Sequence, residues 1–176
     1  RIAAYNADGV IADTAPAVAF TVAPPPSSVS TAVLESSGVV IAGDMMTVAS
    51  LDSTGGAAGT LFISTDPMVF PLQTNPLDIA TADAGLPVRF TGTRPIREFV
   101  LYEGAIPYTG ALSGSLTLPY PDEDEDGMVD GTAPPLKAED LRAYTLEGGR
   151  WVPVRGLATL DKKGRAVIIE ISHLSV

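Results

Sequence analysis

Residues 39–64 read VVIAGDMMTVASLDSTGGAAGTLFIS, and this stretch decides which fold we expect. It contains three short runs rich in apolar and β-branched residues, which predict strands over 39–42, 46–51 and 60–64. Turn-forming residues separate the runs, most clearly Asp52-Ser53-Thr54-Gly55-Gly56. Short strands at this spacing are typical of an antiparallel β-sandwich.

The same pattern continues on both sides of this stretch. Asp161-Lys162-Lys163-Gly164 is typical of a tight hairpin turn. Helical character is confined to 75–84 and 135–140, and each of these segments is long enough for one or two turns. The other predicted strands are 31–35, 87–91, 98–102, 115–118, 142–146, 151–155 and 166–171. We therefore predict an all-β fold, a mostly antiparallel β-sandwich over residues 27–176.

Residues 1–26 are expected to form an extended arm outside the sandwich. Pro24-Pro25-Pro26 favours a polyproline segment without backbone donors, which acts as a stiff spacer. Ahead of it, residues 17–22 read AVAFTV and alternate as a strand does. Three interpretations stay open: the first strand of the chain's own sheet, an interdomain linker, or a strand donated to a neighbouring subunit by β-augmentation.

Composition and charge exclude several classes of partner. The formal net charge is -10, and no Lys or Arg lies between Arg1 and Arg89, so a phosphate-binding surface for nucleic acid is not expected. No apolar run has the length of a transmembrane helix. The chain has no cysteine, which rules out a disulfide framework. Its start at Arg1, without a signal-peptide pattern, is what we expect of a processed protein or a piece of a longer one.

The sharpest chemical signal is the run DEDEDGMVD at 122–130, which holds six carboxylates in nine residues. Aspartates at loop positions one, three and five converge when the chain curls, and glycine at position six permits the sharp turn. Position seven offers a backbone carbonyl, and position nine supplies a further oxygen. This pattern predicts a calcium site whose ligands are the side chains of Asp122, Asp124, Asp126 and Asp130 and the carbonyl of Met128.

The run departs from an EF-hand, because position twelve is Ala133 instead of a bidentate Glu and no strong helix flanks the loop. It resembles the helix-poor, Asp-rich loops of dockerin-like and thrombospondin type 3-like calcium modules. A further ligand is expected from Glu139 or Asp140, or from water. The alternative is a solvated acidic loop, as most charge runs are. The expected affinity suits millimolar extracellular calcium.

The C-terminal third carries a second signal. From about Leu116 it includes Pro119-Tyr120, the acidic run, Trp151-Val152-Pro153-Val154, the turn at 161–164 and His173-Leu174-Ser175. With these motifs it resembles the C-terminal half of bacterial relatives of ZU5 and GAIN-type autoproteolytic domains. The resemblance implies a single cleavage between Leu174 and Ser175, with His173 as general base and Ser175 as nucleophile. The alternative is that His173, the only histidine in the chain, is structural.

We therefore predict a calcium-stabilised structural module of an extracellular or cell-surface protein, adhesive or filament-forming, and not a turnover enzyme. The expected partners are other copies of the chain, reached through its N-terminal arm, or neighbouring domains of a longer surface protein. A self-processing domain is the alternative function, and a carbohydrate-binding module is a third. Trp151, the only tryptophan, is expected to anchor the core instead of binding a sugar.

Overall fold

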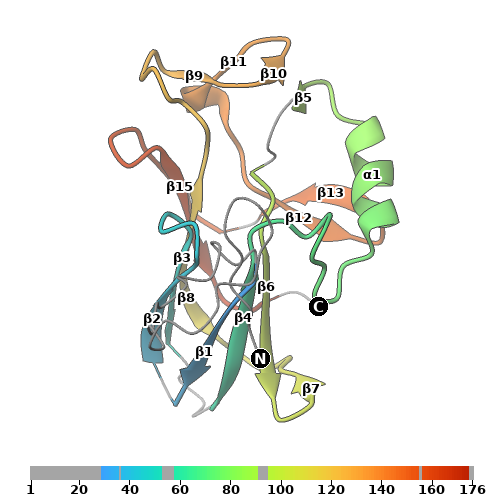
Figure 1. The fold of residues 1–176 in the computed structure, drawn as a ribbon, viewed down its shortest axis with the longest axis vertical. Coiled ribbons are helices and arrows are strands. Elements are labelled where there is room, and N and C mark those ends of the chain that lie inside the picture. Colours follow the sequence, from blue (N-terminus) through green and yellow to red (C-terminus); the bar gives the residue numbers. More distant parts are fainter. Residues whose placement is uncertain (1–28, 36, 53–57, 91–94, 155, 175–176) are drawn as a thin grey trace, which may run out of the picture.

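The computed structural model describes residues 29–35, 37–52, 58–90, 95–154 and 156–174. Two antiparallel sheets form the body of the molecule, and one helix and three short strand pairs surround them (Figure 1). The predicted all-β fold is confirmed. The predicted arm over 1–26 lies outside the described residues.

The first sheet has four strands in the order β1-β4-β6-β7. Its strands are β1 (Val29–Leu34), β4 (Gly59–Ser64), β6 (Glu98–Glu103) and β7 (Ile106–Pro107). Strand β4 is paired along its whole length on both sides, whereas β7 pairs with only the last two residues of β6. The strand at this edge of the sheet is therefore only two residues long.

The second sheet has five strands in the order β14-β15-β8-β3-β2. Its strands are β2 (Ser37–Ile41), β3 (Val48–Asp52), β8 (Ser113–Pro119), β14 (Ala158–Asp161) and β15 (Ala166–Ile171). All of the pairings are antiparallel. The predicted turn at 161–164 is confirmed, because it lies in the hairpin that joins β14 to β15.

The main hydrophobic core lies between the two sheets, as the alternating strands require. The first sheet contributes Leu34, Leu61, Ile63 and Leu101, and the second contributes Val40, Ala49, Leu51 and Leu116. Each buried aliphatic side chain stabilises the fold by roughly 1.5–3 kcal/mol. This shared core makes the two sheets a sandwich.

A single α-helix, α1 (Pro76–Ala84), is described, and it packs against β13 (Arg150–Pro153). The Asn75 side chain caps its first turn by accepting the N–H of Leu77 at 3.0 Å, and Pro76 begins the helix. Ile79 is its buried residue. The helical segment predicted at 75–84 is confirmed. No helix among the described residues has the length and apolar character needed to span a bilayer.

Three short strand pairs lie outside the two sheets; two of them lie together at one end of the molecule, and the third lies beside α1 (Figure 1). Their elements are β5 (Arg89–Phe90) with β10 (Thr132–Ala133), β9 (Met128–Val129) with β11 (Leu136–Lys137), and the hairpin of β12 (Tyr144–Glu147) with β13, besides the 3-10 turn at Ala138–Asp140. Tyr120, Val129 and Ala138 form a second, smaller core beneath β9 and β11. The acidic run at 122–130 follows Tyr120 in the sequence and contains Val129, so it is continuous with this minor core.

The observed strands differ from the predicted ones in several places. Strand β3 begins at Val48 instead of residue 46, because the Asp44 carboxylate accepts the N–H groups of Met46 and Thr47 and closes a turn there. Strands β7, β9, β10, β11 and β14 were not predicted. The longest of them is β14. Most of its side chains are exposed on the outer edge of the sheet, so its sequence carries no apolar pattern.

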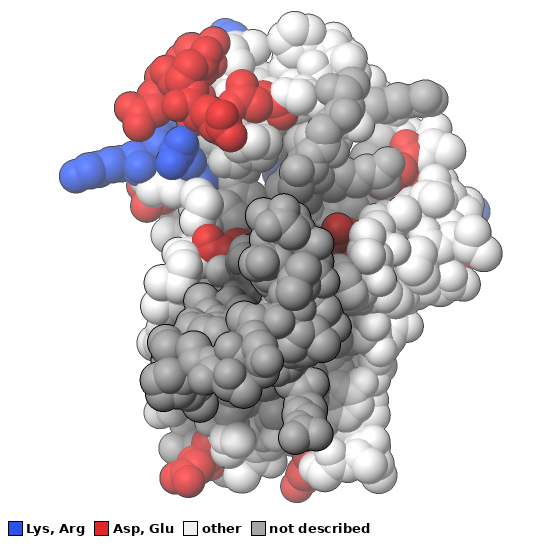
Figure 2. Space-filling model, in the orientation of Figure 1, with Lys and Arg blue, Asp and Glu red and all other residues white. Residues whose placement is uncertain are grey.

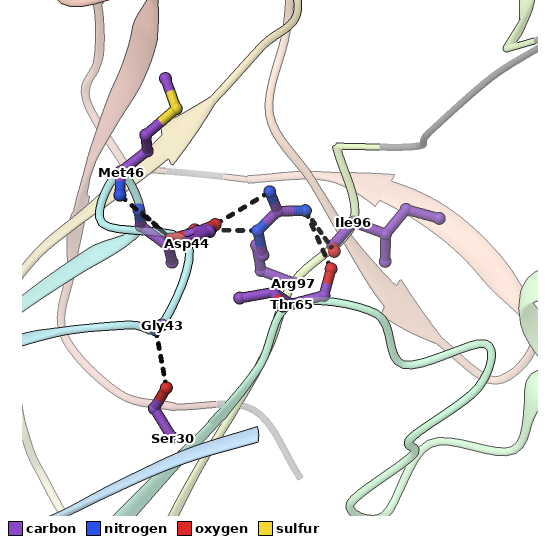
Figure 3. A network of polar contacts seen from close by, with 8 residues as sticks. Ser30, Gly43, Asp44, Met46, Thr65, Ile96 and Arg97 are labelled. Carbon is purple, nitrogen blue, oxygen red and sulfur yellow. Dashed lines mark hydrogen bonds and ion pairs between the residues drawn. The ribbon is translucent and has the colours of Figure 1, made fainter. Parts of the chain in front are cut away.

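A polar network joins the two sheets at the turn between β2 and β3 (Figure 3). Arg97, which precedes β6, donates from Nε to Thr47 Oγ1 at 2.8 Å and from Nη2 to Asp44 Oδ2 at 3.2 Å. Its Nη1 donates to the carbonyl oxygens of Thr65 and Ile96. Because Thr47 is fully buried, these hydrogen bonds satisfy polar groups that would otherwise be costly to bury.

Candidate metal site

Residues 122–127 of the acidic run lie in the loop between β8 and β9, and residues 128–130 comprise β9 and Asp130. One carboxylate oxygen from each of Asp122, Asp124 and Asp126 lies within 4.8 Å of the other two. The structure therefore brings together three of the four predicted side-chain ligands. Figure 2 shows acidic side chains gathered at the end of the molecule that carries β9 and β11, close to basic side chains.

Asp122 is the buried member of this group, with 5% of its surface exposed. Its Oδ1 is buried and has no hydrogen-bond partner among the described residues. Burial of a carboxylate oxygen without a hydrogen-bond partner costs free energy, because the oxygen loses its hydrogen bonds to water and forms none within the protein. A cation held between Asp122, Asp124 and Asp126 would supply the missing partner.

The backbone of the loop is curled by its own aspartates. Asp124 Oδ1 accepts the N–H of Asp126 at 3.3 Å, and Asp126 Oδ1 accepts the N–H of Met128 at 2.7 Å. Gly127 has φ of +80°, a left-handed conformation that side chains other than glycine adopt at a cost. A Cβ at residue 127 would contact no other atom. Glycine is therefore needed at loop position six because of its positive φ and not because of a lack of space.

Met128 begins β9. Ala138 N–H donates to Gly127 O at 2.9 Å, so residues 127 and 138 form a hydrogen-bonded pair of the β9–β11 ladder. Pairs alternate in an antiparallel ladder, and the next pair, Met128 with Lys137, is therefore the non-hydrogen-bonded one. The Met128 carbonyl therefore points away from β11, and its role as a metal ligand stays a prediction.

Asp130 lies outside the group of three carboxylates. Its Oδ2 accepts the N–H of Glu123 at 2.7 Å, and its own N–H donates to Pro121 O at 2.9 Å, so it closes the loop on itself. Its role as a metal ligand stays a prediction. The Glu139 carboxylate lies 3.5 Å from Lys162 and 3.8 Å from Lys137, and neither Glu139 nor Asp140 belongs to the group.

Arg165 attaches the loop to the turn between β14 and β15. Its Nη1 donates to the carbonyl of Asp122 at 3.1 Å, and its own carbonyl accepts the N–H of Tyr120 at 2.9 Å. Sequence reasoning missed Arg165, because the residue stands 43 positions from Asp122. The loop is therefore anchored to the second sheet at both Tyr120 and Asp122.

The pKa of the Tyr120 phenol depends on its burial and on the charges around it. Burial raises its pKa above the ordinary value of 10.0, the negative charges of Asp122 and Asp161 raise it further, and Arg165 opposes them. The main cause is the removal of water from the phenolate, which the minor core imposes. A positive charge that enters the loop should therefore lower the pKa of Tyr120.

The C-terminal motif is only partly described. His173 is exposed, and its Nδ1 lies 3.3 Å from Ser172 Oγ. Leu174 packs against the main core. Ser175 lies outside the described residues, so the predicted cleavage between Leu174 and Ser175 stays a prediction, to be checked by intact-mass comparison with a Ser175→Ala variant.

Trp151 is half-buried on β13 and belongs to neither hydrophobic core. Its indole Nε1 donates to Asp83 Oδ1 of α1 at 2.8 Å. The prediction that it anchors the core was wrong in this detail. It anchors the helix to the β12–β13 hairpin instead.

The fold and this loop define the class of the molecule, an all-β sandwich that carries a candidate cation-binding loop at one end. No protein-family model matches the chain, and no curated protein or solved structure shows significant similarity to it. The functional argument therefore depends on the chemistry of the loop.

Proposed function

We propose that this chain is a structural module of an extracellular or cell-surface protein, and that it is stabilised by a calcium ion bound in the loop over 122–130. The observation that carries the proposal is the buried, unpartnered Oδ1 of Asp122 beside the carboxylates of Asp124 and Asp126. In an acidic run that was only a solvated loop, we would expect every carboxylate to be exposed to water.

The chemistry of the donors favours calcium among divalent ions. All of the candidate ligands are oxygens, from carboxylates and one backbone carbonyl, and a hard cation prefers such ligands. Calcium accepts six to eight oxygens in a flexible geometry, so ligands on a short, exposed loop suit it. Magnesium demands stricter octahedral geometry and retains its water, which such a loop serves less well.

We expect the ion to make the loop rigid. Calcium would neutralise carboxylates that repel one another, and it would fix the loop against Tyr120 and Arg165. Because the loop leads from β8 into the strand pairs over the minor core, a rigid loop holds these strands against the sandwich. Calcium bound only to the folded state stabilises it by mass action, by about 2.7 kcal/mol at a concentration 100-fold above Kd.

Calorimetric titration with calcium, and with magnesium as the competing ion, tests the proposal. We expect one calcium per chain and a melting temperature that rises with calcium and falls in excess EGTA. The same melting curve with calcium and with EGTA would refute it.

Two double variants, each of which removes two negative charges, test whether calcium binds at a defined site or is attracted by the acidic surface in general. Asp124→Asn with Asp126→Asn removes two members of the group of three, and we expect it to abolish binding. Glu123→Gln with Glu125→Gln removes two neighbouring charges that lie outside the group, and we expect calcium to bind with only modestly lower affinity. Equal losses in the two variants would show that the loop attracts cations without a defined site.

A further inference from the structure

A cavity of about 580 Å³ lies where the second sheet extends beyond the main core. Leu118 of β8 and Val167 of β15 stand opposite each other in this sheet, and both line the cavity. Leu118 is two positions from Leu116, which belongs to the main core, so the two side chains share the inner face of the sheet. Among the described lining residues, none comes from the strands of the first sheet. The cavity is therefore a space beside the sandwich and not a defect within its core.

The other walls of the cavity are mostly apolar. α1, which lies beside β13 in Figure 1, contributes to them, and so do Phe90 and Leu136, which pack against the minor core. Further apolar lining residues include Leu86, Val88, Pro95, Ile96 and Leu141. Protein interiors are close-packed and rarely leave voids larger than one water molecule, whereas ligand cavities have volumes of about 300–1,000 Å³. The size and the apolar walls thus indicate a ligand site.

Three polar side chains of the wall already have partners. Trp151 Nε1 donates to Asp83 Oδ1 at 2.8 Å. The Arg97 guanidinium donates to Thr47 Oγ1 and to Asp44 Oδ2. A ligand gains little from polar groups placed against atoms that are already hydrogen-bonded, and those groups would lose their own water. We therefore expect the part of the ligand that enters the cavity to be hydrocarbon.

Arg142 and Tyr144 bring polar groups to the rim of the cavity. Both residues line it and are exposed, Tyr144 with 46% of its surface. Ala143 O accepts the N–H of Val154 at 3.0 Å, which continues the β12–β13 ladder by one pair. The backbone is therefore extended here, and side chains two positions apart lie on the same side of it. Arg142 and Tyr144 consequently present their polar groups together.

The contacts of Arg142 leave one edge of its guanidinium for an anion. Nη1 donates to the carbonyl oxygens of Glu139 and Leu141 at 3.1 and 2.7 Å. Within the described part of the chain, Nε and Nη2 of Arg142 and the hydroxyl of Tyr144 have no hydrogen-bond partner. Nε and Nη2 suit a carboxylate, which accepts two parallel hydrogen bonds from such an edge. Asp140 also lines the cavity, but an ionised carboxylate provides no donor, so its charge only weakens the contact.

We propose that this cavity binds the anion of a fatty acid. The hydrocarbon chain lies against Leu118 and Val167, and the carboxylate accepts hydrogen bonds from Arg142 and from the hydroxyl of Tyr144. Burial of the chain removes apolar surface of the ligand and of the wall from water, and the carboxylate fixes the direction in which the ligand enters. This site does not depend on calcium, since no residue of the loop over 122–130 lines the cavity.

Titration with dodecanoate, followed by calorimetry and by the fluorescence of Trp151, tests for the site. Trp151 is the only tryptophan and lines the cavity, so its emission should change until one dodecanoate is bound per chain. 1-Dodecanol has the same chain length without the charge, and we expect it to bind more weakly. A signal that does not saturate, or that saturates at many molecules per chain, would overturn the proposal.

Three variants test the contact with the carboxylate. Arg142→Gln should lower the affinity for dodecanoate about tenfold or more and leave the affinity for 1-dodecanol unchanged. Arg150→Gln removes the same charge from the same hairpin at a position that does not line the cavity, and should change neither affinity. Asp140→Asn removes a repelling charge, so we expect dodecanoate to bind about two- to fivefold more tightly. Equal dodecanoate affinities in wild type and Arg142→Gln, or an equal loss in the two arginine variants, would overturn the assignment of the carboxylate to Arg142.

A larger side chain on α1 tests the location. Ala80 is exposed and lines the cavity, so Ala80→Phe places a ring in the space that the hydrocarbon chain requires. Thr81→Phe adds the same ring at the next position of the helix, which does not line the cavity. We expect the affinity for dodecanoate to fall about tenfold or more in Ala80→Phe alone, while both variants melt as the wild type does. Equal affinity in all three proteins, or an equal loss in both variants, would show that the ligand does not occupy this cavity.

Discussion

Arg97 Nη2 lies 3.2 Å from Asp44 Oδ2, and this ion pair ties the turn between β2 and β3 to the residue that precedes β6 (Figure 3). The two side chains are mostly buried, with 9% and 23% of their surface exposed. The pair thus joins one sheet of the sandwich to the other at the edge of the main core. Its contribution depends on the whole network, because Asp44 also accepts hydrogen bonds from Thr47 and Met46.

We expect removal of either partner to destabilise the sandwich. Asp44→Ala leaves the buried Thr47 without its acceptor and removes the carboxylate that pairs with Arg97, at a cost of about 2–4 kcal/mol. Arg97→Ala should cost a similar amount. In a double-mutant cycle by urea unfolding, the two changes should be non-additive by about 1–3 kcal/mol. Additive effects would contradict the coupling.

The same pair predicts how stability depends on acid. Burial opposes ionisation of Asp44, but the hydrogen bonds from Thr47 and Met46 and the charge of Arg97 outweigh it, so its pKa lies below the ordinary value of 3.8. A carboxylate with a depressed pKa adds stability above its unfolded pKa, and this stability is lost as the pH falls through the folded pKa. The difference in free energy of unfolding between wild type and Asp44→Asn should be constant near neutral pH and should shrink below about pH 4. A difference independent of pH would contradict this assignment.

Asp122→Asn should have effects of opposite sign with and without calcium. In EGTA the variant removes a buried carboxylate whose Oδ1 has no hydrogen-bond partner among the described residues, so we expect it to be as stable as the wild type or more stable. In calcium it removes a ligand, so the gain in melting temperature seen for the wild type should be lost. Thermal unfolding in both conditions measures this. An equal gain from calcium in both proteins would place the ion elsewhere.

Tyr120 should titrate differently when calcium is bound. Burial raises its pKa, and the charges of Asp122 and Asp161 contribute. A raised pKa means that the stability associated with the neutral phenol is present below pH 10 and is lost as the pH rises through the folded pKa. Calcium beside Asp122 should lower the pKa of Tyr120. The difference in phenolate absorbance between wild type and Tyr120→Phe isolates this one tyrosine, and an unchanged titration in calcium would contradict the placement of the ion.

Asp83→Ala should loosen α1 from the β12–β13 hairpin. The variant leaves the indole N–H of Trp151 without its acceptor, at a cost of about 1–2 kcal/mol. Since Trp151 is the only tryptophan, its fluorescence emission should shift to the red as water approaches. Asp78→Ala, on the same helix, is the matched control and should leave the emission unchanged. A shift of equal size in both variants would mean that the Asp83 contact does not hold the ring.

The local features of this protein were readable from its sequence. Strand alternation, the hairpin at 161–164 and the helix over 75–84 depend on neighbouring residues, and they were predicted correctly. The same holds for the convergence of Asp122, Asp124 and Asp126, since positions two residues apart in a curled loop meet whatever the rest of the chain does.

Only the tertiary structure decided which distant side chains meet. Arg97 stands 53 residues from Asp44, Trp151 stands 68 from Asp83, and Arg165 stands 43 from Asp122. No local pattern encodes such pairs, because each is set by how the sheets register and cross. The burial of Asp122 is of this kind. The sequence marks Asp122 as one acidic residue among six, and the packing of the minor core under Tyr120 makes it the buried one.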